Sequence, residues 1–148
     1  MKKVCLQILI GFSFICIFAI NASAHCEIPC GIYDDEMRIN MINEHIATIE
    51  KSMNQIMSLE KEKHHNANQL VRWVMNKEHH ASELQDIVTQ YFMTQRIKIN
   101  AKDYDKKLGF LHQMLVYSMK CKQTTDLSHV TKLRNLVKEF QTLYFGAK

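Results

Sequence analysis

Apolar residues recur three or four positions apart through most of the chain beyond residue 40, which is the period of one face of an α-helix. Polar residues at 61–65 interrupt this pattern, and three more apolar stripes follow. The stripes predict four amphipathic helices. Their members are Met41, Ile42, Ile46, Ile49, Met53, Ile56 and Met57; Ala67, Leu70, Val71, Trp73, Val74, Ala81, Leu84, Val88, Tyr91 and Phe92; Tyr104, Leu108, Leu111, Met114, Leu115 and Met119; and Val130, Leu133, Leu136, Val137, Phe140, Leu143 and Tyr144.

Residues that favour helix N-caps precede each stripe, and the connections between stripes are short. The second helix is expected to run some 30 residues. The chain has only 4 glycines and 1 proline in 148 residues, too few for the many tight turns of an all-β fold. The pattern therefore predicts an all-α fold, an antiparallel four-helix bundle over residues 34–148. The expected caps are Asp34 or Asp35, Asn66, Asp103, and Thr125 or Asp126.

The first 24 residues have the pattern of a secretory signal peptide. Lys2 and Lys3 precede an apolar run at 4–20, and Ala22, Ser23 and Ala24 form a small-x-small cleavage pattern. The alternative is a membrane anchor, but the run is at the short end for a span. We expect removal of residues 1–24 and export, to the periplasm or by secretion, with no membrane attachment afterwards.

The overall charge excludes one class of partner. The formal net charge is +4, and it falls to +2 when Lys2 and Lys3 are removed. A net charge this small does not indicate a protein that binds nucleic acid. It favours a small anionic substrate only weakly.

The sequence His-Cys-Glu-Ile-Pro-Cys-Gly-Ile-Tyr-Asp follows the expected cleavage site at residues 25–34. Pro29 disfavours a helix and Gly31 adds backbone freedom, so the segment is expected to form a compact loop that brings Cys26 and Cys30 together. Cleavage before His25 would add its α-amine and imidazole and the amide nitrogen of Cys26. A planar set of two nitrogens and two thiolates suits Ni(II) or Cu(II).

Two other interpretations fit the same cysteines. In an oxidising compartment Cys26 and Cys30 can form a disulfide, and the chain would then be a secreted helical binding module. Alternatively, the loop carries nickel or copper without catalysing a reaction. The spacing alone leaves these alternatives open, and Cys121 remains without a partner after cleavage.

The motif H-C-x-x-P-C-G-x-Y-D at a processed N-terminus resembles nickel superoxide dismutase, and this chain matches every fixed position. The resemblance implies one nickel ion per subunit. It implies that His25 binds through amine and imidazole, Cys26 through amide nitrogen and thiolate, and Cys30 through thiolate. Superoxide would be converted to dioxygen and hydrogen peroxide by Ni(II)/Ni(III) cycling. The implied organisation is a nickel-binding hook at 25–33 and a helical bundle at 34–148, which form one domain of a homohexamer.

The resemblance also implies two tyrosines at the site. Tyr33 would stand over the open face of the metal as a catalytic residue that orders and gates the substrate, and Tyr91 would lie nearby. One position departs from the family, which commonly carries an acidic residue after the Arg-Ile pair. Here that residue is Asn40, so Asn40, Glu36 and Glu44 are alternative partners of the His25 imidazole.

The remaining histidines do not suggest a metal site. Adjacent helix residues point about 100° apart, so His64 with His65, or His79 with His80, cannot readily chelate from one helix. We expect these pairs to be solvated. His45 and His112 are expected to be ordinary polar residues on their helices.

Overall fold

The computed structural model describes residues 31–62 and 66–146. The predicted signal peptide and the predicted ligands His25, Cys26 and Cys30 lie outside these residues. Contacts divide the chain into Met1–Ile32, of which Gly31 and Ile32 are described, and a compact unit, Tyr33–Lys148. All the described helices lie in the compact unit.

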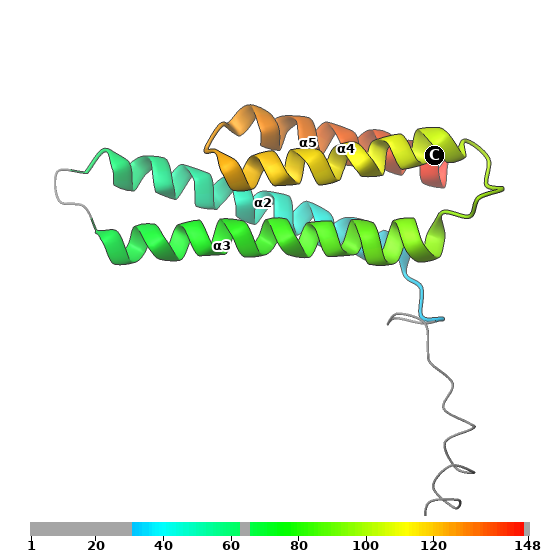
Figure 1. Ribbon diagram of the computed structural model, residues 1–148, viewed down its shortest axis with the longest axis horizontal. Coiled ribbons are helices and arrows are strands. Elements are labelled where there is room, and N and C mark those ends of the chain that lie inside the picture. Colours follow the sequence, from blue (N-terminus) through cyan, green and yellow to red (C-terminus); the bar gives the residue numbers. More distant parts are fainter. Residues whose placement is uncertain (1–30, 63–65, 147–148) are drawn as a thin grey trace, which may run out of the picture. The chain divides into compact units, whose positions relative to one another are not determined.

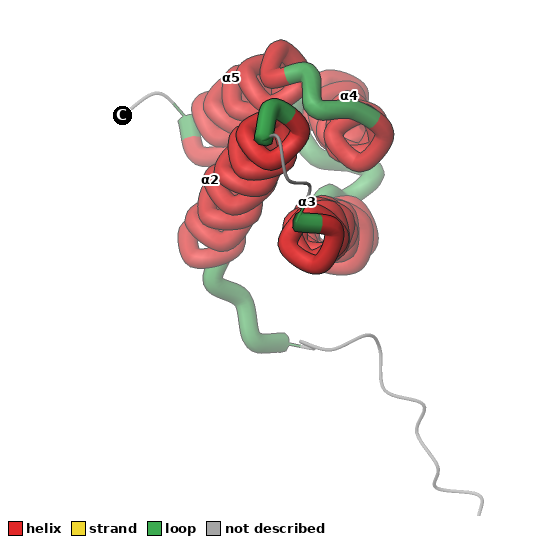
Figure 2. Tube along the Cα trace, turned by 90° about the vertical axis from the view of Figure 1, so that its left-hand side faces the viewer, coloured by secondary structure: helices red, strands yellow, loops and turns green. Residues whose placement is uncertain are grey.

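The described residues form helices and no strands (Figure 1). Helix α2 packs against α3 and α5, and α4 packs against the same two helices, so the four helices surround a common core (Figure 2). Consecutive helices run in opposite directions, which confirms the predicted antiparallel four-helix bundle. The elements are α2 (Asp35–Glu60), α3 (Ala67–Asp86), the π-helix η1 (Ile87–Arg96), α4 (Tyr104–Gln123) and α5 (Leu127–Phe145).

Three of the predicted caps hold their helices by side-chain hydrogen bonds. Asp34 accepts from the amide of Met37, Asn66 from that of Gln69, and Asp126 from that of Ser128. These bonds satisfy amides that a helix start leaves unpaired.

Asp103 precedes α4 as expected but does not cap it through its side chain. Its backbone is left-handed, with φ of 55°, and its side chain makes no capping hydrogen bond. The carboxylate instead lies 3.3 Å from the ammonium nitrogen of Lys106. The prediction of a side-chain cap was therefore wrong at this helix.

The predicted stripes supply most of the core, but the start of α3 is an exception. Val71 and Val74 are 55% and 38% exposed. Helix α2 has 26 residues and α3 with η1 has 30, whereas α4 and α5 have 20 and 19. The end of α2 and the start of α3 therefore extend past α4 and α5 (Figure 1), and Val71 and Val74 lie in this extended part of α3.

The second helix spans the expected 30 residues, but its last third is a π-helix. In η1 the backbone bonds join residues five apart, as between the amide of Ile97 and the carbonyl of Phe92 at 2.9 Å. Residues five apart therefore lie about one turn apart on the same side, whereas an α-helix would turn them well away from each other. No helix in the described parts of the chain has the length and hydropathy of a membrane span.

Candidate functional site

The structure describes two of the residues predicted at the site, Tyr91 in η1 and Tyr33. Tyr33 begins the compact unit. Its side chain is half exposed, at 46%. The guanidinium carbon of Arg96 lies 4.3 Å from the centre of its ring, and the ring of Tyr91 meets it edge-on at 6.1 Å. These contacts hold the ring. Within the described residues the Tyr33 hydroxyl has no hydrogen-bond partner.

Asp35, at the first position of α2, is the centre of a polar cluster beside Tyr33. Arg96 donates from Nε to Oδ1 at 2.8 Å and from Nη2 to Oδ2 at 2.7 Å. The hydroxyl of Tyr91 donates to Oδ1 at 2.5 Å, and that of Tyr144 donates to Oδ2 at 2.8 Å. We call these four residues the Asp35 cluster. It joins α2, η1 and α5 at one end of the bundle.

The Asp35 cluster keeps its carboxylate charged and its phenols neutral. Burial raises the pKa of Asp35, but hydrogen bonds from Arg96, Tyr91 and Tyr144 offset this and leave the pKa below its usual value. Burial, and then the hydrogen bond to Asp35, raise the pKa of Tyr91 and of Tyr144 to about 12. The hydroxyls of Tyr91 and Tyr144 therefore both donate to Asp35, whereas the Tyr33 hydroxyl has no hydrogen-bond partner among the described residues.

The π-helix explains why Tyr91 and Arg96 reach the same carboxylate. They are five residues apart, which is the hydrogen-bonding interval of η1. In a regular α-helix they would point about 140° apart, too far to share Asp35. The guanidinium of Arg38 lies 5.1 Å from the Tyr91 ring on another side, and its Nε is buried without a partner in the described residues.

The three alternatives for the His25 partner lie on the first part of α2. Asn40, Glu36 and Glu44 are all exposed. Glu44 also acts electrostatically on His45 and His80. Because His25 lies outside the described residues, which of the three contacts its imidazole stays a prediction.

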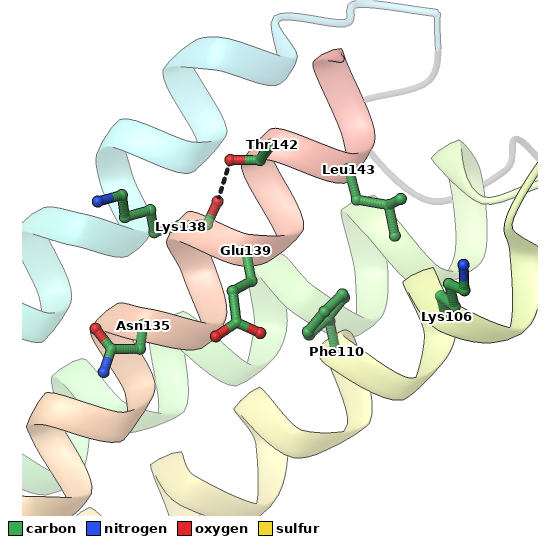
Figure 3. Close-up of a pocket in the computed structure, with 7 residues that line it drawn as sticks. All are labelled: Lys106, Phe110, Asn135, Lys138, Glu139, Thr142 and Leu143. Atoms are coloured by element: carbon green, nitrogen blue, oxygen red, sulfur yellow. Dashed lines mark hydrogen bonds between the residues drawn. The ribbon is translucent and has the colours of Figure 1, made fainter. Parts of the chain in front are cut away.

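Other parts of the described structure include a groove between α4 and α5 and a pair of histidines. No group of three or more His, Cys, Asp or Glu side chains among residues 31–62 and 66–146 is arranged to hold a metal ion. A groove between α4 and α5 has mixed apolar and charged walls without converging polar groups (Figure 3). It is lined by Lys106, Phe110, Asn135, Lys138, Glu139, Thr142 and Leu143.

His45 and His80 come together between α2 and α3, and both are half-buried. Their Nδ1 atoms are 2.9 Å apart. Sequence reasoning considered chelation within one helix and did not anticipate this contact between two helices. His112 is exposed on α4, as predicted.

Comparison with known proteins identifies the family. Residues 20–148 match the family model of nickel-containing superoxide dismutase. The comparisons with curated proteins and with solved structures found no match. The chain therefore belongs to the nickel-containing superoxide dismutases, which are oxidoreductases. This confirms the predicted enzyme class, the nickel cofactor of each subunit and superoxide as the substrate.

Sequence reasoning missed Asp35, Arg96 and Tyr144 as neighbours of Tyr33. Asp35 was considered only as a helix cap, and Tyr144 only as a core residue. Their meeting depends on how α5 and the π-helix pack against the start of α2, which helical periodicity does not specify. The single available signal was an arginine five residues after Tyr91 at the end of an apolar stripe.

Proposed function

We propose that this chain dismutates superoxide at a nickel ion held by His25, Cys26 and Cys30, with Tyr33 as the residue that receives the substrate. The observation that carries the proposal is the state of Tyr33, whose ring is held by Arg96 and Tyr91 while its hydroxyl makes no hydrogen bond to the described residues. Tyr33 follows Cys30 by three positions, with Gly31 and Ile32 between them, so the chain limits the distance between their Cα atoms to about 11 Å.

The proposed ligands fit nickel by their chemistry. After cleavage, His25 offers an α-amine and an imidazole, and Cys26 offers an amide nitrogen and a thiolate beside the thiolate of Cys30. Two thiolates and an anionic amide donate electron density, so the bound nickel supplies one-electron chemistry by alternating between Ni(II) and Ni(III). Cys121 is a poor alternative ligand, because burial raises its pKa to about 11 and keeps it a thiol.

Tyr33 is proposed to order the incoming anion through its hydroxyl. A neutral phenol can donate one hydrogen bond to an anionic oxygen. Tyr91 and Tyr144 cannot do this without leaving Asp35, because each already donates to that carboxylate. The Asp35 cluster would therefore act as the support of Tyr33, since Arg96 holds both the Asp35 carboxylate and the Tyr33 ring.

The N-terminal processing and export of the chain are also proposals. The pattern of residues 1–24 supports a signal peptide, cleavage before His25, and a periplasmic or secreted product. A residue left before His25 would turn its amine into a peptide nitrogen and remove one ligand. Active protein should therefore begin with His-Cys-Glu on N-terminal sequencing, and active protein that begins with Ala24 would contradict the assignment.

A homohexamer is proposed on the resemblance of the hook motif to the family. Exposed apolar side chains on the first half of α3 fit an assembled state, since Val71 and Met75 are 55% and 65% exposed. Sedimentation of the mature protein gives the subunit number directly. A monomer at micromolar concentration would overturn this part of the proposal.

The test of the proposed function uses mature protein loaded with nickel, with metal content and superoxide consumption measured together. Cys26→Ser and Cys30→Ser should each lose nickel and activity, because a hydroxyl is a poor substitute for a soft thiolate. Cys121→Ala is the matched control and should retain both. Metal without dismutation would favour a carrier, and a Cys26–Cys30 disulfide without metal would favour a binding module.

The role of Tyr33 is tested by Tyr33→Phe, which keeps the ring and its contact with Arg96. We expect unchanged nickel content, with altered saturation by superoxide and altered inhibition by azide. Unchanged kinetics and azide response would remove Tyr33 from the site.

A further inference from the structure

Two histidines from different helices face each other in the α2–α3 hairpin. The Nδ1 atoms of His45 and His80 are 2.9 Å apart, and their ring centres are 5.1 Å apart with planes at 50°. One hydrogen bond between two ring nitrogens needs a proton on one and a lone pair on the other. Both side chains are half-buried, so the pair has one side toward the core and one toward solvent.

The two imidazoles are held in the form that binds metals. Burial, and then the charge of His80, lower the pKa of His45. Burial, and then the charge of His79, lower the pKa of His80. Neutral imidazole nitrogen is a common ligand of transition metals. Neither ring therefore needs to lose a charge before it binds an ion.

The separation of the two nitrogens is that of an ordinary hydrogen bond, and it is also close to the spacing of two ligands at a right angle on one metal ion. Metal–imidazole bonds are about 2.0–2.1 Å long, so two ligands at a right angle have nitrogens about 2.9 Å apart. Two ligands of a tetrahedral ion would lie about 3.3 Å apart at the same bond length. Right-angled nitrogen ligands are typical of Cu(II) and Ni(II), whereas zinc favours the tetrahedron.

Acidic side chains around the pair favour a bound cation. Glu83 and Glu44 each act electrostatically on His45 and on His80, in the direction that stabilises positive charge. Glu83 also lies 3.9 Å from Nδ1 of His79, whose ring is 5.4 Å from that of His80. These carboxylates lie close enough to favour a positive charge at the pair, although in the described structure they do not form a group of three metal-binding side chains with it.

We propose that His45 and His80 form a second metal site, which binds one Ni(II) or Cu(II) ion through both Nδ1 atoms with water completing the coordination. The ion would replace the proton that the two nitrogens share, and it would tie α2 to α3. The site is separate in sequence from the hook at 25–33. Its affinity is expected to be modest, because Nε2 of His45 is buried without the acceptor that usually orients a metal-bound imidazole.

The test uses the mature protein with its hook already filled with nickel. Added Cu(II) or Ni(II) is titrated by equilibrium dialysis, and Cu(II) samples are examined by electron paramagnetic resonance. We expect one further ion per chain and, for Cu(II), splitting from two imidazole nitrogens. His80→Gln should weaken this binding roughly tenfold or more, and the exposed control His112→Gln should leave it unchanged.

Three outcomes would overturn the second site: no further ion, splitting from fewer than two nitrogens, or unchanged binding in His80→Gln. Circular dichroism of His80→Gln checks that the bundle is intact. A chain with both Cys26→Ser and Cys30→Ser separates this proposal from the hook. It should lose the hook ion and keep the His45–His80 ion, so either proposal can fail without the other.

Discussion

The Asp35 cluster and the His45–His80 pair are two polar groups packed between helices, and they differ in how completely they are satisfied. Asp35 accepts four hydrogen bonds from Arg96, Tyr91 and Tyr144. The histidines share one hydrogen bond, and Nε2 of His45 is buried without a partner in the described residues. A charge is retained where enough donors converge on it, whereas the neutral pair keeps binding capacity for a ligand.

The two groups also act on different parts of the bundle. The Asp35 cluster joins three elements at the end where Tyr33 begins the compact unit. The histidine pair joins only α2 to α3, which are already connected as neighbours along the chain. We therefore expect loss of the first group to affect stability strongly, and loss of the second to affect metal binding more than folding.

The largest effect is expected from Asp35→Asn. The substitution leaves the Arg96 charge without its carboxylate. Removal of one partner from a fully buried ion pair costs about 3–5 kcal/mol of unfolding free energy, and this half-buried pair should lie at the lower end of that range. Urea denaturation measures the loss. Glu50→Gln is the matched control, because Glu50 pairs with Arg134 on the surface and such pairs contribute about 1 kcal/mol or less. If the two variants lost the same unfolding free energy, Asp35 would stabilise the bundle no more than a surface ion pair does.

A smaller loss is expected from Tyr144→Phe, which removes one donor from Asp35 and keeps the ring stacked against Phe140. Hydrogen bonds to charged groups contribute about 1.5–3 kcal/mol. Tyr117→Phe is the control, since its hydroxyl has no hydrogen-bond partner in the described residues. If the two variants unfold at the same urea concentration, the bond from Tyr144 does not stabilise the bundle.

The stability that Asp35 contributes should depend on pH in one direction. Its folded pKa lies below its usual value, so the unfolded chain takes up this proton at a higher pH than the folded chain does. The contribution is complete above about pH 4 and is lost as the pH falls through the folded pKa. Melting temperatures measured from pH 6 downward should therefore fall less in Asp35→Asn than in the unchanged protein. If the melting temperatures of the two proteins fell equally with pH, Asp35 would not be the source of the pH dependence.

The smallest effect is expected from His80→Gln without added metal. The substitution removes one hydrogen bond of a half-buried pair, which contributes about 1 kcal/mol. Urea denaturation of the metal-free bundle measures it. If His80→Gln lost as much unfolding free energy as Asp35→Asn, the histidine pair would stabilise the bundle as much as the Asp35 cluster does. The proposed difference between the two groups would then be wrong.

The sequence by itself determined the four helical segments, the bundle and the family motif. Helical periodicity depends on neighbours three and four residues away, and capping depends on residues within one turn. The caps at Asp34, Asn66 and Asp126 and the core of α5 followed from such local rules. The motif at 25–34 is likewise contiguous, so the nickel family was recognisable before any packing was known.

Only the tertiary structure decided which side chains meet across helices. Asp35 and Tyr144 are 109 residues apart, and His45 and His80 are 35 apart. Periodicity gives the buried face of each helix but not the axial position at which two faces pack, and it did not predict the π-helix that directs Tyr91 and Arg96 to one carboxylate. Contacts at such separations depend on packing of the whole bundle, because no local interaction specifies them.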